Sequence, residues 1–323
     1  MTGKERVHRA VEFDRPPVIP RSSRRPDTDD SDTFTAGVRP PAGFTPVKPG
    51  ADEWGCVRQH NRGAGQAGYP IDHPLGDWSR YGDYVFPDPF AEGRFDHMDR
   101  MVEAGDPRLR EKFVCALIGH GPIEKLSFLL GFENFLVTLV SHPARIEELV
   151  RQHHAYMLGI VEQLATYAAV DAIFFVDDSA MQSGPYFSMD MWCRFFKQPL
   201  HELCDAIHAG GKKVMMHSCG NLTDHIAEFI HCGVDILDNK QPLLWLDAAR
   251  EFSGKIVFHS CLDYPVFERT PQGALTGRIH DLIRRLGMPE GGFIGTINNM
   301  IDDRVPREKI RTAWEAYRAF EWG

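Results

Sequence analysis

Short runs of consecutive apolar residues alternate with longer amphipathic segments over the last two thirds of the chain. The runs are rich in β-branched and aromatic residues, as is typical of strands buried on both faces, and they lie at 113–118, 171–176, 214–217, 234–237, 256–259 and 293–296. Helical spacing, capping residues and glycine stops predict intervening and terminal helices at 144–168, 188–209, 223–233, 246–252, 271–286 and 306–320.

This alternation predicts a parallel sheet whose strands are covered by helices. Six strands are recognisable after residue 110, and the Gly-x-Gly-x-x-Gly turn of a dinucleotide-binding fold is absent. A chain of 323 residues lies within the range of one α/β barrel. We therefore expect a single (β/α)8 TIM barrel domain over residues 1–323, with its regular repeats at 111–323.

The first third, residues 1–110, is expected to be an irregular N-terminal part that supplies the missing barrel strands. It is rich in Pro, Gly, Asp and Arg, and only a helix at 4–13 and a short strand at 84–86 are predicted in it. Residues 21–80 are expected to form a long excursion that packs through Trp54, Tyr69 and Trp78. Loops of that length in compact proteins are usually functional or disordered.

Composition narrows the class of protein. The net charge is −9, the isoelectric point is near 5.9, and no basic block stands out, so we expect no nucleic-acid partner and no membrane partner. No apolar run spans a bilayer, and the first residues lack the hydrophobic stretch of a signal peptide. The seven cysteines are scattered and odd in number, which indicates reduced thiols. These features predict a cytoplasmic protein.

The tripeptide His-Ser-Cys occurs twice, as His217-Ser218-Cys219 and as His259-Ser260-Cys261, each time after an apolar run. On a strand, residues two apart point to the same face. Each triplet should therefore present an imidazole and a thiol side by side, with the serine turned away. Zinc prefers such ligands, and a catalytic zinc has three protein ligands and an open position. The alternative is that both triplets are buried structural elements without a metal.

Polar residues follow five of the expected strands, where a barrel carries its chemistry. These strand ends therefore predict an active site at one rim of the barrel, and His120, in Gly119-His120-Gly121-Pro122, follows a further strand. The five segments are Asp177-Asp178, His217-Ser218-Cys219, Asp238-Asn239-Lys240-Gln241, His259-Ser260-Cys261-Leu262-Asp263 and Asn298-Asn299.

Several of these motifs resemble the uroporphyrinogen decarboxylase superfamily, especially its decarboxylase-like and corrinoid-linked methyltransferase branches. The resemblance covers nearly the whole chain and is carried by Asp177-Asp178-Ser179-Ala180-Met181-Gln182-Ser183-Gly184-Pro185, Met216-His217-Ser218-Cys219-Gly220-Asn221, Asp52-Glu53-Trp54-Gly55, Phe86-Pro87-Asp88-Pro89 and Gly291-Gly292-Phe293-Ile294. It implies a (β/α)8 barrel, often dimeric, with its cleft at the strand ends. In the methyltransferase branch a His-x-Cys and a later Cys bind zinc, and the His-x-Cys carries over to His217 and Cys219.

The chain departs from both branches. Methyltransferases of the coenzyme M type usually place the third ligand Cys after the last strand, where this chain reads Gly295-Thr296-Ile297-Asn298-Asn299. Cys261 would have to substitute. The true decarboxylases carry Arg-Gln-Ala-Gly-Arg near the start and a histidine after the last strand, whereas this chain has Arg21-Ser22-Ser23-Arg24-Arg25 and an asparagine. Porphyrinogen decarboxylation is therefore disfavoured.

The sequence and the resemblance together favour a zinc-dependent methyltransferase or demethylase component. It would move a methyl group between a corrinoid, free or on a partner protein, and a small thiol or related acceptor. The alternatives are a cofactor-free lyase that decarboxylates a tetrapyrrole or other carboxylated substrate, and a catalytically idle ligand-binding barrel. We expect a homodimer on the resemblance alone.

Each candidate residue has an expected role under this hypothesis. The metal ligands are His217, Cys219 and Cys261, with His259 as a further option. The catalytic candidates Asp177, Asp178 and Gln182 position substrate or orient a ligand, although the aspartates also suit a helix-start cap. The substrate-binding candidates are Arg21 and Arg24, which would clamp a carboxylate or sulfonate unless they are solvated, together with Gln241 and Asn298.

Overall fold

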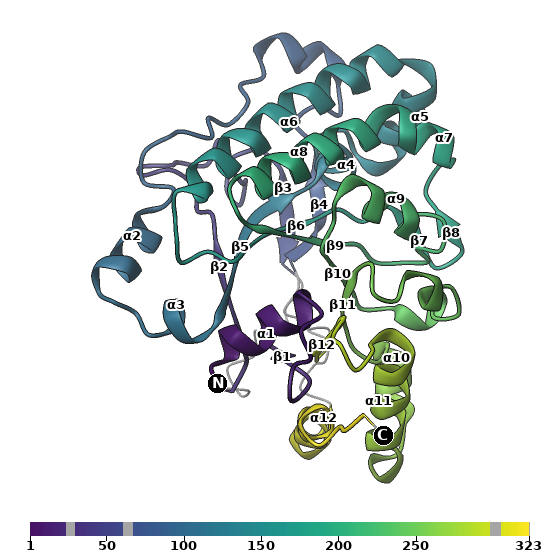
Figure 1. Ribbon diagram of the computed structural model, residues 1–323. Coiled ribbons are helices and arrows are strands. Elements are labelled where there is room, and N and C mark those ends of the chain that lie inside the picture. Colours follow the sequence, from purple (N-terminus) through teal and green to yellow (C-terminus); the bar gives the residue numbers. More distant parts are fainter. Residues whose placement is uncertain (24–29, 61–66, 298–304, 323) are drawn as a thin grey trace.

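A computed structural model describes residues 1–23, 30–60, 67–297 and 305–322, and it has a parallel β-barrel surrounded by helices (Figure 1). In this part of the chain, eight parallel strands form one sheet in the order β1-β12-β11-β10-β9-β6-β5-β2. The strands are β1 (Arg21–Ser22), β2 (Thr33–Gly37), β5 (Phe113–His120), β6 (Ala172–Val176), β9 (Lys213–His217), β10 (Ile236–Asn239), β11 (Val257–Ser260) and β12 (Phe293–Thr296).

The first and last strands of this order, β1 and β2, nearly close the barrel. The backbone N–H of Asp32 donates to the carbonyl of Arg21 at 2.7 Å, and the hydroxyls of Ser22 and Thr33 are 2.7 Å apart. The predicted (β/α)8 barrel is therefore confirmed, with β1 and β2 supplied by the first third of the chain as expected.

Helices cover the outside of the barrel on both sides of the view in Figure 1, with α4 to α8 above and α10 to α12 below. The longer helices are α1 (Gly3–Val11), α2 (Asp96–Glu103), α4 (Pro122–Leu130), α5 (Phe132–Ser141), α6 (Pro143–Ala165), α8 (Gln198–Ala209), α9 (Ile226–Cys232), α11 (Gln272–Leu286) and α12 (Arg307–Arg318). The shorter ones are α3 (Arg108–Glu111), α7 (Met189–Trp192), α10 (Tyr264–Arg269), the 3-10 turns η1 (Trp78–Asp83), η3 (Pro242–Leu244) and η4 (Ala248–Phe252), and the π-helical turn η2 (Cys193–Lys197). No helix in the described segments is long and apolar enough to cross a membrane.

Side chains alternate between the barrel interior and the layer under the helices, as strand geometry requires. The side chains that point into the barrel form one apolar cluster, which includes Phe174, Met215, Ile236 and Val257. Their neighbours along the strands pack outward against the helices in a second, larger core. Helix α1 inserts Val7 and Val11 into the interior cluster, so the amino end of the barrel is filled with apolar side chains. In such barrels the opposite end carries the active site.

The first third is more regular than expected. Residues 21–80 contain β1, β2 and an antiparallel hairpin of β3 (Val57–His60) and β4 (Ala67–Asp72). Strand β2, with the sequence Thr-Phe-Thr-Ala-Gly, escapes prediction because its residues are small or polar. Trp54 is buried as expected, whereas Tyr69 is exposed.

The strand predicted at 84–86 is wrong. The Tyr84 hydroxyl donates to the carbonyl of Trp54 at 2.9 Å, and the ring of Phe86 packs edge-on against both aromatic rings. The aromatic stretch was predicted as a strand because of its composition, but its side chains fix an irregular segment to the body of the protein.

The regular helices lie close to their predicted positions. Ser188 caps α7 by accepting from the Met191 N–H, and the helix then continues through the π-helical turn η2 into α8. Pro199 lies in the first turn of α8, directly after the π-helical turn, where the helix type changes.

Candidate functional site

A single row of residues crosses the carboxyl edge of the sheet. The strand register aligns His120 of β5 with Val176 of β6, Val176 with His217 of β9, His217 with Asp238 of β10, and Asp238 with His259 of β11. Residues paired in this way point to the same face of a sheet. The side chains of His120, His217, Asp238 and His259 therefore lie at one level above the apolar interior.

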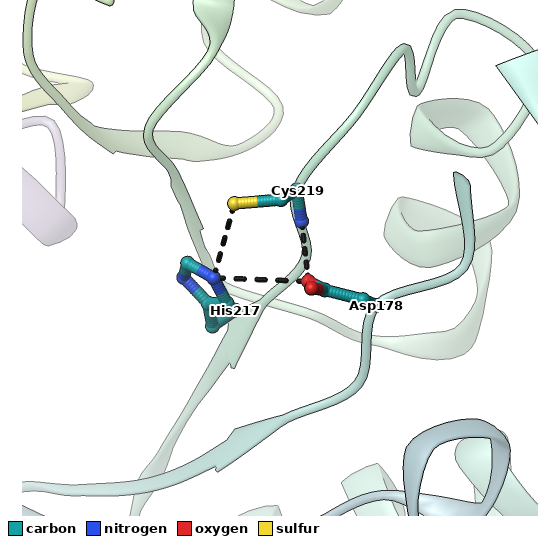
Figure 2. A group of neighbouring side chains, drawn as sticks. All are labelled: Asp178, His217 and Cys219. Atoms are coloured by element: carbon teal, nitrogen blue, oxygen red, sulfur yellow. Dashed lines mark hydrogen bonds and ion pairs between the residues drawn. The ribbon is translucent and has the colours of Figure 1, made fainter. Parts of the chain in front are cut away.

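Three potential metal ligands meet in this region (Figure 2). Among the described residues, Asp178, His217 and Cys219 form the group of His, Cys, Asp and Glu side chains whose ligand atoms lie within 4.8 Å of one another. The Nε2 atom of His217 is 3.3 Å from the Sγ atom of Cys219 and 3.7 Å from the Oδ1 atom of Asp178. The imidazole and thiol of the first His-Ser-Cys triplet thus lie side by side, as the sequence predicts.

The spacing of these atoms fits a tetrahedral zinc ion. Two donors bound at about 2.0–2.3 Å and separated by the tetrahedral angle lie roughly 3.3–3.8 Å apart. The two distances from His217, 3.3 and 3.7 Å, are close to these values. Nitrogen, sulfur and carboxylate oxygen are all accepted zinc ligands, and three of them leave a fourth position open.

Asp238 organises the imidazoles behind this group. Its carboxylate lies 2.8 Å from Nδ1 of His217 and 2.6 Å from Nδ1 of His259, and it pairs with the ammonium group of Lys240. Burial would raise the pKa of Asp238, but Lys240 and the two imidazoles hold that pKa well below its usual range. An ionised carboxylate on Nδ1 leaves Nε2 of His217 as the nitrogen that faces Cys219 and Asp178.

The electrostatics of His217 follow from its neighbours Cys219 and Asp238. Burial lowers the pKa of its imidazole, but the sulfur of Cys219 and the carboxylate of Asp238 together raise it well above its ordinary value. These neighbours therefore favour a positive charge on the His217 ring.

The loop after β9 holds Cys219 in place through backbone contacts. The N–H of Cys219 donates to Oδ1 of Asp178 at 2.7 Å, and the N–H of Gly220 donates to Oε1 of Gln241 at 2.9 Å. Gly220 has a φ of +86°, and a Cβ atom there would lie 2.3 Å from the carbonyl oxygen of Ala180. This turn accordingly requires glycine. Ser218 points into a buried contact with Ser179, away from the ligand atoms, as expected.

The His and Cys side chains of the second His-Ser-Cys triplet lie in different environments. His259 is turned toward Asp238, whereas Cys261 lines a cavity of about 10 Å³ beneath helices α10 to α12, with Phe267 and Tyr317. The chain leaves β11 at Ser260, so the two-residue alternation of a strand does not extend to Cys261. Burial raises the pKa of the Cys261 thiol to about 12. Asp178, not Cys261, is the third member of the group of ligand atoms in this structure.

The other predicted site residues take different positions. The carboxylate of Asp177 is buried and accepts from the N–H of Glu124 at 2.9 Å, so it caps the start of α4 from a neighbouring strand. Gln182 is exposed at the turn between the short strands β7 (Ala180–Met181) and β8 (Gly184–Pro185). Gln241 supports the loop of Cys219. Arg21 is buried and pairs with Asp30 at 2.7 Å over the ring of Trp314, so protein groups already satisfy it. Arg24 and Asn298 lie outside the described residues.

Glu124 belongs to this region although the sequence analysis gave it no role. It lies in the first turn of α4, directly after the end of β5, and its Oε2 atom is buried without a hydrogen-bond partner among the described residues. Burial and the adjacent Asp178 raise the pKa of its carboxyl group to about 8. The only available sequence signal was its place three residues after Gly121, where a strand end leads into a helix.

Comparisons with known proteins agree with this architecture. A family model described as uroporphyrinogen decarboxylase (URO-D) matches residues 65–320. The solved structure of a methyltransferase from Methanosarcina mazei has a TM-score of 0.71 and 13% sequence identity, covering 98% of each chain. A D-psicose 3-epimerase from Clostridium cellulolyticum H10 is more remote, with a TM-score of 0.39 and 12% identity over 74% of this chain and 84% of that one. No curated protein matches the chain significantly.

The methyltransferase comparison shows a shared fold, since its sequence identity is low. The family match is broader evidence, because it covers most of the chain, including the strands that carry Asp178, His217 and Cys219. The chain belongs to the uroporphyrinogen decarboxylase family.

Proposed function

We propose that this protein is a zinc-dependent methyltransferase component that moves a methyl group between a corrinoid and a small thiol or related acceptor. The observation that carries the proposal is the convergence of His217 Nε2, Cys219 Sγ and Asp178 Oδ1 at the mouth of the barrel. A decarboxylase that needs no cofactor has no evident use for such a set. The shared fold with a methyltransferase is consistent with this function.

His217, Cys219 and Asp178 would hold the ion, and Asp238 would orient His217 from behind. Zinc bound there would lower the pKa of a coordinated thiol, so that the nucleophilic thiolate predominates at neutral pH. Asp178 has a second role within the chain, because its contact with the N–H of Cys219 fixes the direction of the thiol. The apolar interior below this level excludes water from the inner side of the site.

Metal analysis of the purified protein tests the ligand set. We expect one zinc per chain in the wild type and in Cys261→Ala, and loss of zinc in Cys219→Ala and Asp178→Ala. Cys261→Ala is the matched control, because it removes a thiol from the second triplet. Circular dichroism of each variant checks that the fold is kept. If Cys261→Ala lost zinc and Asp178→Ala kept it, the third ligand would be Cys261; absence of zinc from the wild type would refute the proposal.

Turnover tests the reaction. With methylcobalamin and a small thiol, we expect demethylation of the corrinoid, followed through its visible absorbance, that depends on zinc and on Cys219. Conversion of uroporphyrinogen to coproporphyrinogen by the metal-free protein would instead support the lyase. Binding of either compound without turnover would support the idle barrel. The homodimer expected from the resemblance is tested separately by light scattering.

A further inference from the structure

A cavity of about 210 Å³ lies beside the candidate metal site, where β2 and β5 end. A single water needs only about 10–15 Å³ of such space, so this cavity has room for a small organic group. Its polar lining comes from Asp52, Glu53, Arg58, His120, Lys125, His153 and Tyr156. The hairpin of β3 and β4, which carries Arg58, and helix α4, which carries Lys125, provide its two cationic side chains.

Lys125 is the unusual member of this lining. It is 4% exposed, and its ammonium group lies 4.6 Å from the centre of the Trp54 ring. Among the described residues its ammonium makes no hydrogen bond or ion pair, although it carries three donors. Burial lowers the pKa of Lys125. A buried ammonium without a partner is costly, and it lines the cavity.

Arg58 offers further donors at the same cavity. Its guanidinium lies 4.6 Å from the centre of the Phe128 ring, and one nitrogen is 3.5 Å from Nε2 of His120. Four of its five N–H donors remain without a partner in the described part of the chain. A planar guanidinium of this kind matches the two oxygens of a carboxylate.

The two acidic residues of the lining already have hydrogen-bond or ion-pair partners within the protein. Glu53 pairs with Arg94 at 2.6 Å and accepts from the Tyr156 hydroxyl at 3.2 Å. Asp52 accepts from the backbone N–H groups of Trp54 and Cys56 at 3.0 and 2.9 Å. With Glu53 neutralised by Arg94, the charges of Arg58 and Lys125 exceed that of Asp52 by one. The cavity is therefore suited to one added negative charge.

Apolar side chains make up much of the remaining wall of the cavity. Val38, Leu117, Ile118 and Met157 line the cavity. His120 lines the cavity, and the strand register places it beside Val176, which in turn pairs with His217 on the next strand. A molecule with an anionic end in the cavity and an apolar body would therefore extend toward Asp178, His217 and Cys219.

We propose that this cavity binds the carboxylate of a small organic substrate, between the guanidinium of Arg58 and the ammonium of Lys125, with the apolar part of that substrate toward the metal site. This proposal assigns a carboxylate-bearing substrate to the methyl transfer, and its reaction rests on the function proposed above. The binding itself stands independently.

Calorimetric titration of the full-length protein with sodium benzoate, and with benzamide as its neutral isostere, tests the proposal. We expect saturable binding of benzoate at millimolar concentrations and binding of benzamide that is about tenfold weaker or less. Lys125→Met and Arg58→Gln should each weaken benzoate binding by about tenfold or more, the usual loss for a charge-assisted hydrogen bond. Lys125→Met keeps the volume and removes a buried charge, so we expect it to fold.

Lys309→Met is the matched control, because Lys309 is also buried, with its ammonium 5.4 Å from the centre of the Phe267 ring, but lies outside the cavity. Equal affinities for benzoate and benzamide, no saturable benzoate binding, or wild-type affinity in Lys125→Met would overturn the proposal. Zinc content is measured in the same preparations. If the protein bound benzoate selectively but contained no zinc, the proposed function would be refuted and the anion site would stand. If it contained zinc but did not distinguish benzoate from benzamide, the anion site would be refuted and the proposed function would stand.

Discussion

The Asp238 carboxylate lies 2.8 Å from Nδ1 of His217 and thereby leaves Nε2 of that ring facing Cys219 and Asp178. A carboxylate behind a ligand histidine fixes both the orientation of the ring and the nitrogen that carries the proton. His217 would therefore be ready to bind a metal without rearranging.

We expect Asp238→Asn to weaken zinc binding by about 10–100-fold, the usual effect of losing such a partner. Competition with a chromogenic chelator measures this change. Asp235→Asn is the control, because Asp235 holds His208 at 2.7 Å in a similar pair on the same strand region but away from the site. Equal zinc affinity in the Asp238 and Asp235 variants would contradict the role of Asp238. Urea unfolding of both variants separates loss of metal from loss of stability.

Cysteine labelling should distinguish the two triplets. Burial raises the pKa of Cys56 and of Cys261 to about 12, so at pH 8 only about one in 10⁴ of these thiols is ionised. We expect iodoacetamide to modify the exposed Cys193 and the half-buried Cys219, and to leave Cys56 and Cys261 unmodified. Zinc should protect Cys219 and not Cys193. Peptide mass spectrometry measures the labelling of each cysteine with and without zinc. If zinc also protected Cys193, the protection of Cys219 would not be specific to the proposed site.

Gly220→Ala should disrupt the ligand group without touching a ligand. The new Cβ atom would lie 2.3 Å from the carbonyl of Ala180, on a residue with a φ of +86°. We expect a loss of stability of about 1–3 kcal/mol and loss of stoichiometric zinc, because Cys219 must shift. Gly211→Ala separates backbone strain from steric clash, because Gly211 has a φ of +71° but open space around it. Zinc retained in Gly220→Ala would mean that the turn does not position Cys219.

The buried imidazole of His153 makes the stability of the protein depend on pH. Burial, together with the charge of Lys125, lowers the pKa of His153 to about 3, whereas the unfolded chain protonates a histidine near pH 6.5. Between these values the unfolded state binds more protons, so this contribution is complete above pH 6.5 and is lost as the pH falls toward 3. It is on the order of a few kcal/mol.

His153→Gln keeps a donor for the carbonyl of His120, which the ring contacts at 3.0 Å, and removes the proton-binding group. We expect its urea midpoint to fall less than that of the wild type between pH 6.5 and pH 4.5. His231→Gln, at an exposed position, should behave like the wild type. Parallel curves for all three proteins would exclude this role for His153.

The barrel was predictable because six of its strands, β5, β6 and β9 to β12, are mostly apolar runs that stand out by composition alone. The strands of the first third were not predictable, because β1 and β2 contain polar residues. Arg21 and Ser22 form hydrogen bonds with Asp32 and Thr33, eleven positions further along the chain. Such partners are distant in sequence and invisible to periodicity. The pair His217 and Cys219 followed from strand alternation, whereas the choice between Asp178 and Cys261 depended on where each chain segment turns after its strand.

Neither the anion cavity nor Glu124 was apparent from sequence patterns. Lys125 reads as an ordinary helix residue, and its burial depends on Trp54, which comes from an irregular segment 71 positions earlier. Contacts of this kind arise from packing between segments without periodic signals.

The contact between β1 and β2, which closes the barrel, is short because β1 has only two residues. Thermal opening of the cylinder should begin along that seam. The candidate ligands lie at the ends of β6 and β9. The seam is separated from these two strands by β5 and β2 on one side and by β10, β11, β12 and β1 on the other. Fraying at the seam would admit water to the interior while the three donor atoms keep their mutual distances.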